Sequence, residues 1–421
     1  MFNTAKRVVV TGLGTVSPYG LGVNLLWDNV KNGKSCIINK TKLFHHETNP
    51  VHIAGEFYDY EPTDYFEPKE AKRMDRSAQF AVLASDEAVK DAGITDENTD
   101  KTRFGVVIGC GSGGLTAVQE NHLQMIARNN HAKGSPFTIP MMITNMPAGM
   151  VALRHKAKGK TYAVVSACAT GGHSIGEAYR TILYGEADVV LTGGVEAAIC
   201  DIGIGAFAAA RSLSKRNDEP EKASRPYDKD RDGFVMSEGA GVLVLEELEH
   251  AKARGAKIYG EIVGYGSSCD AYDMVAPCPD GEGAAAAMVN ALKDANLKPE
   301  DIDYINTHGT STHAGDIAEI NGVVKVFGDY ATSGKLAISS TKSMHGHALG
   351  AAGGIEAVIC VKAMNNGIVP PTINLDNLDE EIPKGINLVP NKAQEKELNV
   401  VMSNSFGFGG QNVSLIFKKY K

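Results

Sequence analysis

The sequence predicts an α/β protein built from two similar halves. Short apolar runs of strand length alternate with longer segments of helical period along the whole chain, which is typical of α/β folds. Several passages of the first half recur in the second half. The 46 glycines among 421 residues favour tight turns between strands and helices and close packing of the backbone.

Nine apolar runs are predicted to be strands from their length and composition. Several are rich in β-forming residues on both faces, as expected for strands buried between layers of helices. In chain order the predicted strands are Arg7–Thr11, Phe104–Ile108, Tyr162–Val165, Val189–Thr192, Val242–Leu245, Ile258–Val263, Ile302–Asn306, Ala337–Ser339 and Val400–Ser403.

Three pairs of passages relate the two halves. AVKDAGI before VVIGCGSGG parallels ALKDANL before YINTHGTST, and CATGGHSIGEA parallels MHGHALGAAGGIEA. More loosely, VVLTGGVEA parallels VVMSNSFGFGG. A repeat with so long a period indicates gene duplication and pseudo-twofold packing. The join is predicted near HAKARGAK (250–257), which gives an N-terminal half of residues 1–252 and a C-terminal half of residues 253–421.

Composition and charge exclude several classes of protein. The net charge of −8 argues against nucleic acid as the main partner, because phosphate binding needs a basic face. The seven cysteines are scattered without a C-x-x-C pair, which is typical of reduced thiols in a cytosolic protein. The first apolar run breaks at glycine and is too short for a signal peptide or a membrane span. We therefore expect a cytoplasmic enzyme without a membrane segment.

Residues 164–178, VVSACATGGHSIGEA, contain two candidate nucleophiles. Cys168 follows an apolar run and precedes a helix-period segment, so a strand–turn–helix junction is predicted there. The positive end of the helix would stabilise a thiolate and lower the pKa of the thiol. Ser174 fits the G-x-S-x-G pattern of α/β-hydrolases, but it falls about two turns inside the same predicted helix. The cysteine is the preferred nucleophile, and a serine hydrolase using Ser174 is the alternative.

Histidines follow two predicted strands of the second half. NTHGTSTHAGD (306–316) places His308 directly after an apolar strand, and STKSMHGHALGAAGG (340–354) places His345 and His347 after another. A cysteine combined with two distant histidines is typical of thioester chemistry. The sulfur takes an acyl group, and the imidazoles supply protons or hydrogen bonds to a developing oxyanion.

Four stretches resemble, in order, the signature sequences of the β-ketoacyl-[acyl carrier protein] synthases: ACATGGHSIG, NTHGTST, STKSMHGHALGAAGG and SNSFGFGGQN. The resemblance extends from VVVTGLGTVSPYG to the C-terminus and is closest to the type II elongating enzymes (synthase II) of bacterial fatty acid synthesis. It implies a thiolase-like fold with five αβαβα layers and two pseudo-symmetric halves. It also implies a homodimer whose interface helps to close the acyl pocket.

The resemblance implies a decarboxylative Claisen condensation. Cys168 would accept an acyl chain from acyl carrier protein, and malonyl-carrier would then enter the site. His308 and His347 would contact the malonyl thioester carbonyl and stabilise the enolate that remains when CO₂ departs. The enolate would attack the acyl thioester and release 3-oxoacyl-carrier. The backbone N–H groups of Cys168 and Phe408 would form the oxyanion hole, and Phe408 would also act as a gate to the acyl pocket.

The resemblance assigns supporting roles to other residues. Lys342 and its acidic partner Glu319 would fix the orientation and the electrostatic field of the imidazoles. No metal and no cofactor is implied, and the GLG of Gly12–Gly14 lacks the remaining features of a dinucleotide motif. The residues expected to contact substrate are Thr310, Thr312, Ser112, Phe207 and Phe406.

The acidic carrier protein needs a basic docking face. KEAKRMDR supplies Lys69, Lys72, Arg73 and Arg76 at mostly helical spacing, and Arg211 is predicted to extend this face. The same run also fits an ordinary solvated helix face.

Three residues depart from the family pattern, and each leads to a separate expectation. His345 stands where threonine is usual and is expected to line the wall of the site. His313 replaces a usual proline and is expected to loosen its turn. Ser112 replaces a bulky aliphatic residue, which predicts an altered chain-length preference. A specialised polyketide or polyene pathway remains an alternative to fatty acid synthesis, whereas a non-catalytic chain-length subunit is disfavoured because Cys168 and both histidines are present.

Overall fold

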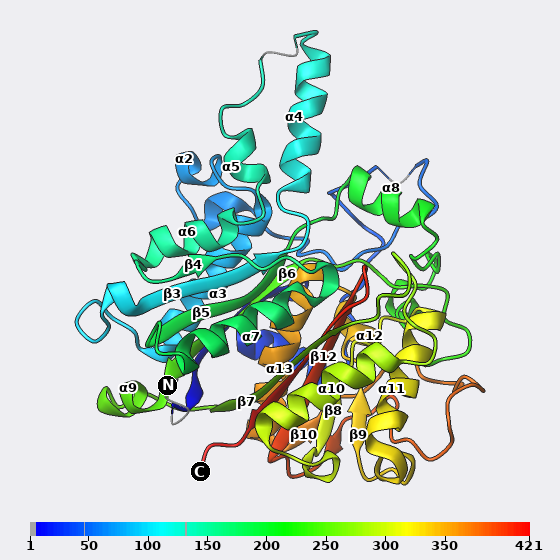
Figure 1. Ribbon diagram of the computed structural model, residues 1–421. Coiled ribbons are helices and arrows are strands. Elements are labelled where there is room, and N and C mark those ends of the chain that lie inside the picture. The colour runs from blue at the N-terminus through cyan, green and yellow to red at the C-terminus, as the bar shows by residue number, and fades with distance from the viewer. Residues whose placement is uncertain (1–5, 46, 131–132) are drawn as a thin grey trace.

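A computed structural model describes residues 6–45, 47–130 and 133–421 of the chain (Figure 1). One sheet runs through the centre of the molecule in the strand order β4-β3-β5-β6-β1-β7-β13-β12-β8-β9. The first five strands of this order come from the N-terminal half: β1 (Val8–Ser17), β3 (Phe104–Cys110), β4 (Thr161–Tyr162), β5 (Val189–Glu196) and β6 (Gly239–Glu247). The other five come from the C-terminal half: β7 (Gly260–Cys269), β8 (Tyr304–Asn306), β9 (Ala337–Ser339), β12 (Val400–Gly407) and β13 (Gln411–Lys418).

The two halves of the sheet have the same topology. In the first, β4, β3 and β5 are parallel, and β6 and β1 continue the sheet with antiparallel pairing. In the second, β9, β8 and β12 are parallel, and β13 and β7 follow in antiparallel pairing. The halves meet where residues 8–10 of β1 pair with residues 260–262 of β7. The repeat in the sequence therefore corresponds to a repeat in the fold.

Two glycine-rich helices, α7 (Thr170–Leu183) and α13 (Ala352–Asn366), lie between the two halves of the sheet (Figure 1). A Cβ atom on Gly171 would lie 2.7 Å from the backbone nitrogen of Gly354, and one on Gly353 would lie 2.6 Å from that of Gly172. Only glycine allows this backbone-to-backbone contact. The glycine pairs in CATGGHSIGEA and GAAGGIEA thus bring the two central helices together.

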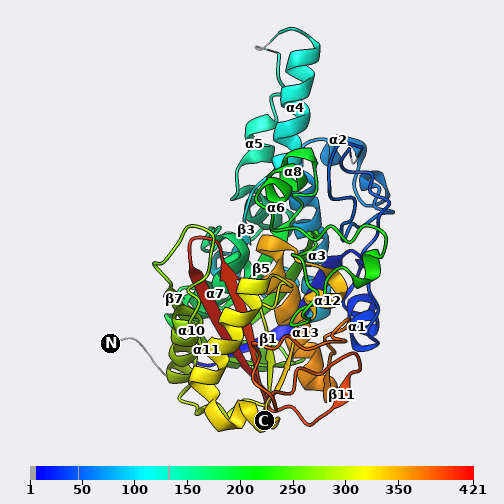
Figure 2. The same cartoon turned by 90° about the vertical axis from the view of Figure 1, so that its right-hand side faces the viewer.

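Helices on the outer faces complete a five-layered structure. Helices α3 (Arg76–Ala92) and α6 (Met146–His155) pack on the first half of the sheet, and α10 (Glu282–Ala295) and α11 (His313–Thr332) pack on the second. The order of layers is helix, sheet, helix, sheet, helix, as the resemblance implied. Helices α4 (Leu115–Ala127) and α5 (Thr138–Met142) form a hairpin that projects from this body (Figures 1 and 2).

The remaining elements lie around this core. They are α1 (Val23–Lys31), α2 (Pro68–Ala71), α8 (Asp201–Ala209), α9 (Leu248–Ala253), α12 (Lys342–His345), β2 (Gly20–Leu21), β10 (Ile368–Val369) and β11 (Gln394–Glu395). Within the described residues, no helix combines the length and apolar character needed to cross a bilayer.

All nine predicted strands are present: Ala337–Ser339 has the predicted bounds, and the other eight have shifted ends. The strand predicted at Tyr162–Val165 is only Thr161–Tyr162, because the chain leaves the sheet early to form the turn that carries Cys168. Strand β13 was not predicted, although it forms the hairpin partner of β12. The predicted boundary after residue 252 falls in the last turn of α9 and stays a prediction.

Candidate active site

Cys168 lies where the chain passes from the sheet to a central helix. It occupies a short 3₁₀ turn, Ala167–Ala169, between β4 and the start of α7 at Thr170. This is the strand–turn–helix junction that the sequence predicts. The cysteine is 8% exposed, so its sulfur lies in a largely dehydrated environment.

Burial sets the protonation state of this thiol. Removal from water raises the pKa of the Cys168 thiol to about 12, because the thiolate loses its hydration. The charge of Lys342 and the backbone N–H groups of Phe408 and Cys168, which donate toward the sulfur, act in the opposite direction. The lowered pKa expected at a helix start is therefore wrong for this structure, since desolvation outweighs the stabilising groups.

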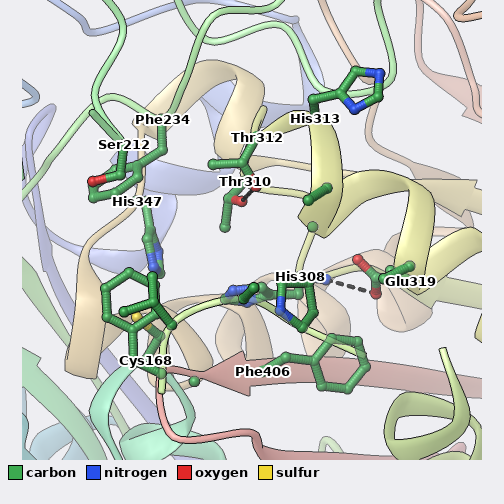
Figure 3. Close-up of a pocket in the computed structure, with 18 of the residues that line it drawn as sticks. Cys168, Ser212, Phe234, His308, Thr310, Thr312, His313, Glu319, His347 and Phe406 are labelled. Carbon is green, nitrogen blue, oxygen red and sulfur yellow. Dashed lines mark hydrogen bonds between the residues drawn. The ribbon is translucent and has the colours of Figure 1, made fainter. Parts of the chain in front are cut away.

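The two predicted histidines meet opposite the cysteine. His308 follows β8, and His347 follows α12. Their ring centroids are 5.2 Å apart with the planes at 88° to each other. Figure 3 shows His347 beside Cys168 and His308 deeper in the same cavity. The duplicated fold thus brings three side chains from distant segments to one place.

Both imidazoles are neutral at physiological pH. Burial lowers the pKa values of His308 and His347 well below 6.5, and the nearby charge of Lys342 lowers them further. A neutral imidazole carries one N–H donor and one acceptor nitrogen. The pair can therefore donate hydrogen bonds to a carbonyl oxygen without bringing a positive charge of its own.

The acidic partner of Lys342 is Glu356, not Glu319. The Lys342 ammonium forms a fully buried ion pair with the carboxylate of Glu356, a residue on central helix α13. Burial raises the pKa of Glu356 to about 7, although Lys342 opposes the rise. The signal that could have identified Glu356 is its position as the one acidic residue of helix α13, within the apolar and glycine-rich stretch AGGIEAVICV.

Glu319 instead supports the turn that carries His308. Its carboxylate accepts hydrogen bonds from the backbone N–H groups of His308 (2.9 Å) and Gly309 (2.7 Å). The amide of Asn404 donates to the same group at 3.3 Å. Burial raises the pKa of Glu319 to about 7. The predicted positioning role thus has a structural basis, but it acts on the backbone of His308 and not through Lys342.

Cys168, both histidines and Glu319 line one mostly apolar cavity of about 470 Å³. The hydroxyls of Thr310 and Thr312 lie 3.0 Å apart on its wall. The predicted site residues that line the cavity are Cys168, Phe207, Arg211, His308, Thr310, Thr312, Glu319, His347, Phe406 and Phe408.

The loop after β12 approaches the cysteine turn closely. A Cβ atom on Gly407 would lie 2.6 Å from the carbonyl oxygen of Ser166 and 3.2 Å from the backbone nitrogen of Cys168, so only glycine fits there. The next residue, Phe408, is 36% exposed at the cavity, and its ring centroid lies 6.1 Å from that of Phe207. The backbone N–H of Phe408 donates toward the sulfur of Cys168, so this loop reaches the nucleophile, and the gating role of Phe408 stays a prediction.

Most of the chain matches two models of one protein family. Residues 5–251 match the family model described as β-ketoacyl synthase, N-terminal domain, and residues 259–376 match the one described as β-ketoacyl synthase, C-terminal domain. The chain belongs to the β-ketoacyl synthase family.

Relatives within the family are similar over their full lengths. The 3-oxoacyl-[acyl-carrier-protein] synthase 2 of Synechocystis is 48% identical, covering 99% of both chains. The protein of the same name from Coxiella burnetii is 48% identical over 98% of this chain and 99% of its own. A β-ketoacyl synthase from Burkholderia phymatum superimposes with a TM-score of 0.90 at 35% identity, covering 99% of this chain and all of that one. A ketosynthase solved with its type II polyketide acyl-carrier protein also gives a TM-score of 0.90, at 34% identity and the same coverage.

Ser112 does not line the cavity described above, and its place on the wall of the acyl pocket stays a prediction. It is exposed and lies outside the residues that line the cavity. Its hydroxyl donates to the buried carboxylate of Glu196 at 2.5 Å, and the backbone N–H groups of Gly111 and Gly350 donate to the same group. Glu196 was not predicted from the sequence, although a carboxylate at the end of an apolar strand is the signal that could have identified it.

The other two departures from the family pattern are His345 and His313. His345 is fully buried behind the cavity, where its ring is hydrogen-bonded to the hydroxyl of Thr341 (3.1 Å), so it does not line the wall. Burial lowers the pKa of His345 to about 3. His313 begins helix α11, at the position where proline is also favoured, and the looser turn expected from it stays a prediction. Its side chain lies 3.1 Å from Glu381 at the edge of the cavity.

The predicted basic run is not one helix face. Lys69 belongs to α2, whereas Arg76 begins α3, and Asp75 caps the second helix between them by accepting from the N–H of Ser77. Arg76 is withdrawn from the surface by an ion pair of 2.6 Å with buried Glu238.

Three members of the basic run, Lys69, Lys72 and Arg73, remain exposed. Arg211 is exposed beside the cavity, next to the end of α8. In the view of Figure 1 the projecting hairpin lies between α2 and α8. The extension of the basic face by Arg211 stays a prediction.

Ser174 is not placed for nucleophilic attack. It lies inside α7, is fully buried, and its hydroxyl donates to the carbonyl of Thr170 at 2.8 Å. A nucleophile elbow would instead expose the serine on a strained turn. The hydrolase alternative is therefore wrong.

Proposed function

We propose that the protein catalyses the decarboxylative Claisen condensation of a Cys168-bound acyl group with malonyl-[acyl carrier protein]. The products are 3-oxoacyl-[acyl carrier protein] and CO₂, and the reaction elongates fatty acids. The convergence of Cys168, His308 and His347 in one apolar cavity carries this proposal. The names and near full-length similarity of the relatives support it.

In the first half-reaction the sulfur of Cys168 attacks the thioester carbonyl of acyl-carrier. A bond forms between this sulfur and the acyl carbon, the bond to the carrier's pantetheine sulfur breaks, and the thiol proton ends on the departing sulfur. His347 lies beside the thiol and can relay that proton. The N–H groups of Cys168 and Phe408 hold the oxyanion, and the loss of one such donor typically costs about 3–4 kcal/mol of barrier.

In the second half-reaction malonyl-carrier replaces the free carrier. The N–H groups of His308 and His347 hold the malonyl thioester oxygen while the carbon–carbon bond to the carboxylate breaks and CO₂ leaves. The resulting enolate carbon attacks the acyl carbon, the carbon–sulfur bond breaks, and the thiolate of Cys168 takes a proton from solvent. Atoms and electrons balance without a redox partner or a metal, so we expect no cofactor.

The Lys342–Glu356 pair supports the second half-reaction through its charge. The buried ammonium opposes protonation of both imidazoles and so keeps them as neutral donors. The same cation also favours the negative charge that develops as the enolate forms. Glu319 holds the backbone of His308 and thereby fixes the position of its ring.

The acyl carrier protein is the proposed partner, and Lys69, Lys72, Arg73 and Arg211 are the proposed docking residues. Reversing two charges with Lys72→Glu and Arg73→Glu should raise KM for the carrier-bound substrate several-fold at low salt, and less at high salt. Lys335→Glu, an exposed lysine beyond α11, is the matched control. An unchanged KM that is insensitive to salt would remove the docking assignment.

We also propose that the protein is a cytoplasmic homodimer. The hairpin of α4 and α5 presents Leu123, Ile126 and Ile139, each more than half exposed, to solvent. A subunit contact would bury these apolar side chains. Light scattering coupled to gel filtration should give twice the chain mass at micromolar concentration, whereas a monomer would contradict the proposal.

The condensation is tested with acyl-carriers of graded length plus malonyl-carrier, followed by mass measurement of the products. The native chain should form 3-oxoacyl-carrier two carbons longer than the acyl donor, with one preferred range of donor length. Cys168→Ser should lose acylation, and His308→Ala and His347→Ala should lose decarboxylation. Release of free fatty acid without a longer product would contradict the proposal. Repeated extension to a poly-3-oxo chain would instead indicate polyketide synthesis.

A further inference from the structure

A buried hydrogen-bonded histidine lies behind the nucleophile turn, and the mechanism above does not use it. The Nδ1 atom of His173, on the first turn of α7, is hydrogen-bonded to the hydroxyl of Ser166 (2.8 Å). Its Nε2 atom is hydrogen-bonded to the hydroxyl of Ser267 on β7 (3.0 Å). The imidazole packs edge-to-face on Tyr265, with the ring centroids 6.2 Å apart. Both ring nitrogens are therefore engaged, and the ring is fixed against the second half of the sheet.

The turn that His173 contacts has a strained backbone. Ala167 has φ +48°, in the left-handed region that non-glycine residues rarely adopt. Such a residue is energetically unfavourable and persists only where its surroundings hold it. Ser166 holds Ala167 from the N-terminal side. The N–H of Ser166 donates to the hydroxyl of Thr170 (2.9 Å), and its carbonyl accepts from the N–H of Ala169 (3.0 Å). The side chain of Ser166 is hydrogen-bonded to His173.

The strained residue determines where an oxyanion-hole donor points. The N–H of Cys168 belongs to the peptide that joins it to Ala167, so rotation at Ala167 redirects that N–H. On the other side of the turn, Gly407 packs against the carbonyl of Ser166 and aligns the following N–H of Phe408 with the same sulfur. The two donors converge only while the position of Ser166 is maintained.

We propose that His173 is a positioning residue for the condensation: through Ser166 it holds the strained turn at Ala167, so that the backbone N–H groups of Cys168 and Phe408 stay aligned as the oxyanion hole. This inference rests on the proposed function. Loss of this positioning should slow the acylation of Cys168, because the oxyanion hole serves the carbonyl that Cys168 attacks or carries. The malonyl group is held separately by His308 and His347.

The variants separate this role from ordinary structural support. His173→Leu removes both hydrogen bonds at similar volume, and Ser166→Ala removes the shared bond from its other end. His173→Asn places an amide near the former Nδ1 atom, where it can bond Ser166 again. The matched control is His155→Leu, which removes a partly buried imidazole of the outer layer that lies 3.3 Å from both the hydroxyl of Ser85 and the carboxylate of Asp86.

Two rates are measured for each variant, together with the melting temperature. One is the acylation of Cys168 by acyl-carrier, and the other is the decarboxylation of malonyl-carrier without an acyl donor. We expect acylation to fall by about 10- to 100-fold in His173→Leu and Ser166→Ala, because small misplacements of an oxyanion donor have effects of this size. The double variant His173→Leu/Ser166→Ala should acylate no more slowly than the slower single variant, since both changes break the same hydrogen bond between His173 and Ser166. Decarboxylation should stay within about threefold of the native rate, and His173→Asn should recover most of the acylation rate.

Acylation within twofold of the native rate in both single variants would overturn the inference. So would an equal loss of both rates that follows the loss of melting temperature and is shared by His155→Leu, because that pattern indicates general destabilisation. If His173→Leu does not fold, Ser166→Ala and His173→Asn decide the question. If the native chain itself accepts no acyl group from any carrier, the proposed function fails first and this inference fails with it.

Discussion

The reactivity of Cys168 toward an alkylating agent should rise with pH and should not level off below pH 10. Because burial raises the pKa of this thiol to about 12, the thiolate fraction grows about tenfold for each pH unit. Between pH 7 and pH 10 the rate of alkylation should therefore increase about 1000-fold. A thiol with an unperturbed pKa of about 8.5 would gain only about 30-fold over the same interval and then reach a plateau.

The assay is pseudo-first-order alkylation with iodoacetamide at four pH values, with the modified Cys168 peptide quantified by mass spectrometry. N-acetylcysteine serves as the reference thiol, and circular dichroism checks that the fold is retained at each pH. A plateau below pH 9 would refute the reasoning. It would mean that the start of α7, the charge of Lys342 and the two backbone donors together outweigh the desolvation of the sulfur, as the sequence analysis expected.

Three further changes test other parts of the site. Gly407→Ala should reduce acylation at least tenfold in stopped-flow assays while the circular dichroism spectrum is retained, because the new methyl group would lie 2.6 Å from the carbonyl oxygen of Ser166. Lys342→Met should cost about 3–5 kcal/mol in urea unfolding by leaving Glu356 without its partner, and Lys342→Met/Glu356→Leu should regain most of that stability but not the activity. When the pH is lowered from 6.5 to 5, the free energy of unfolding in urea should fall by about 2 kcal/mol more in the native chain than in His345→Thr. The folded-state pKa of about 3 lies below the ordinary 6.5, so the unfolded state binds the extra proton and native stability falls as pH decreases. A pH-independent difference would contradict this account.

Much of the fold and the central part of the site could be predicted from the sequence because they depend on local pattern. The nine strands are apolar runs, and the paired passages correspond to paired strands and helices on either side of the β1–β7 contact. Cys168, His308 and His347 each follow a strand or a turn at a repeated position, so a duplicated fold was expected to bring them together. The cavity contains all three.

The features of the site that could not be predicted from the sequence depend on contacts between distant segments. The choice between Glu319 and Glu356 as partner of Lys342 depends on how α11 and α13 pack, and no spacing rule decides it. The pKa of Cys168 depends on how completely the turn is buried, which a local argument from the helix start cannot measure. Ser112 was assigned from the family pattern, but its hydroxyl is bonded to a carboxylate from a neighbouring strand.

The assignment of KEAKRMDR to one helix face was an error that the sequence could have prevented. KEAKRMDR looks continuous on a helical projection, yet Asp75 two residues before Ser77 is a helix-capping signal that divides the run. His173 was also visible in the sequence, within the pattern that suggested a hydrolase. Its contacts with Ser166 and Ser267 become evident only when the two halves of the sheet are assembled.

The most direct test of the central claim is to find which atom holds the acyl group before the carbon–carbon bond forms. The native protein is mixed with an acyl-carrier alone, quenched in acid, digested, and the acylated peptide is sequenced by mass spectrometry. We predict one acyl group per chain, on the sulfur of Cys168, that disappears when malonyl-carrier is added while 3-oxoacyl-carrier forms at the same rate. An acyl group on any other residue, or one that persists after malonyl-carrier is added, would contradict the account.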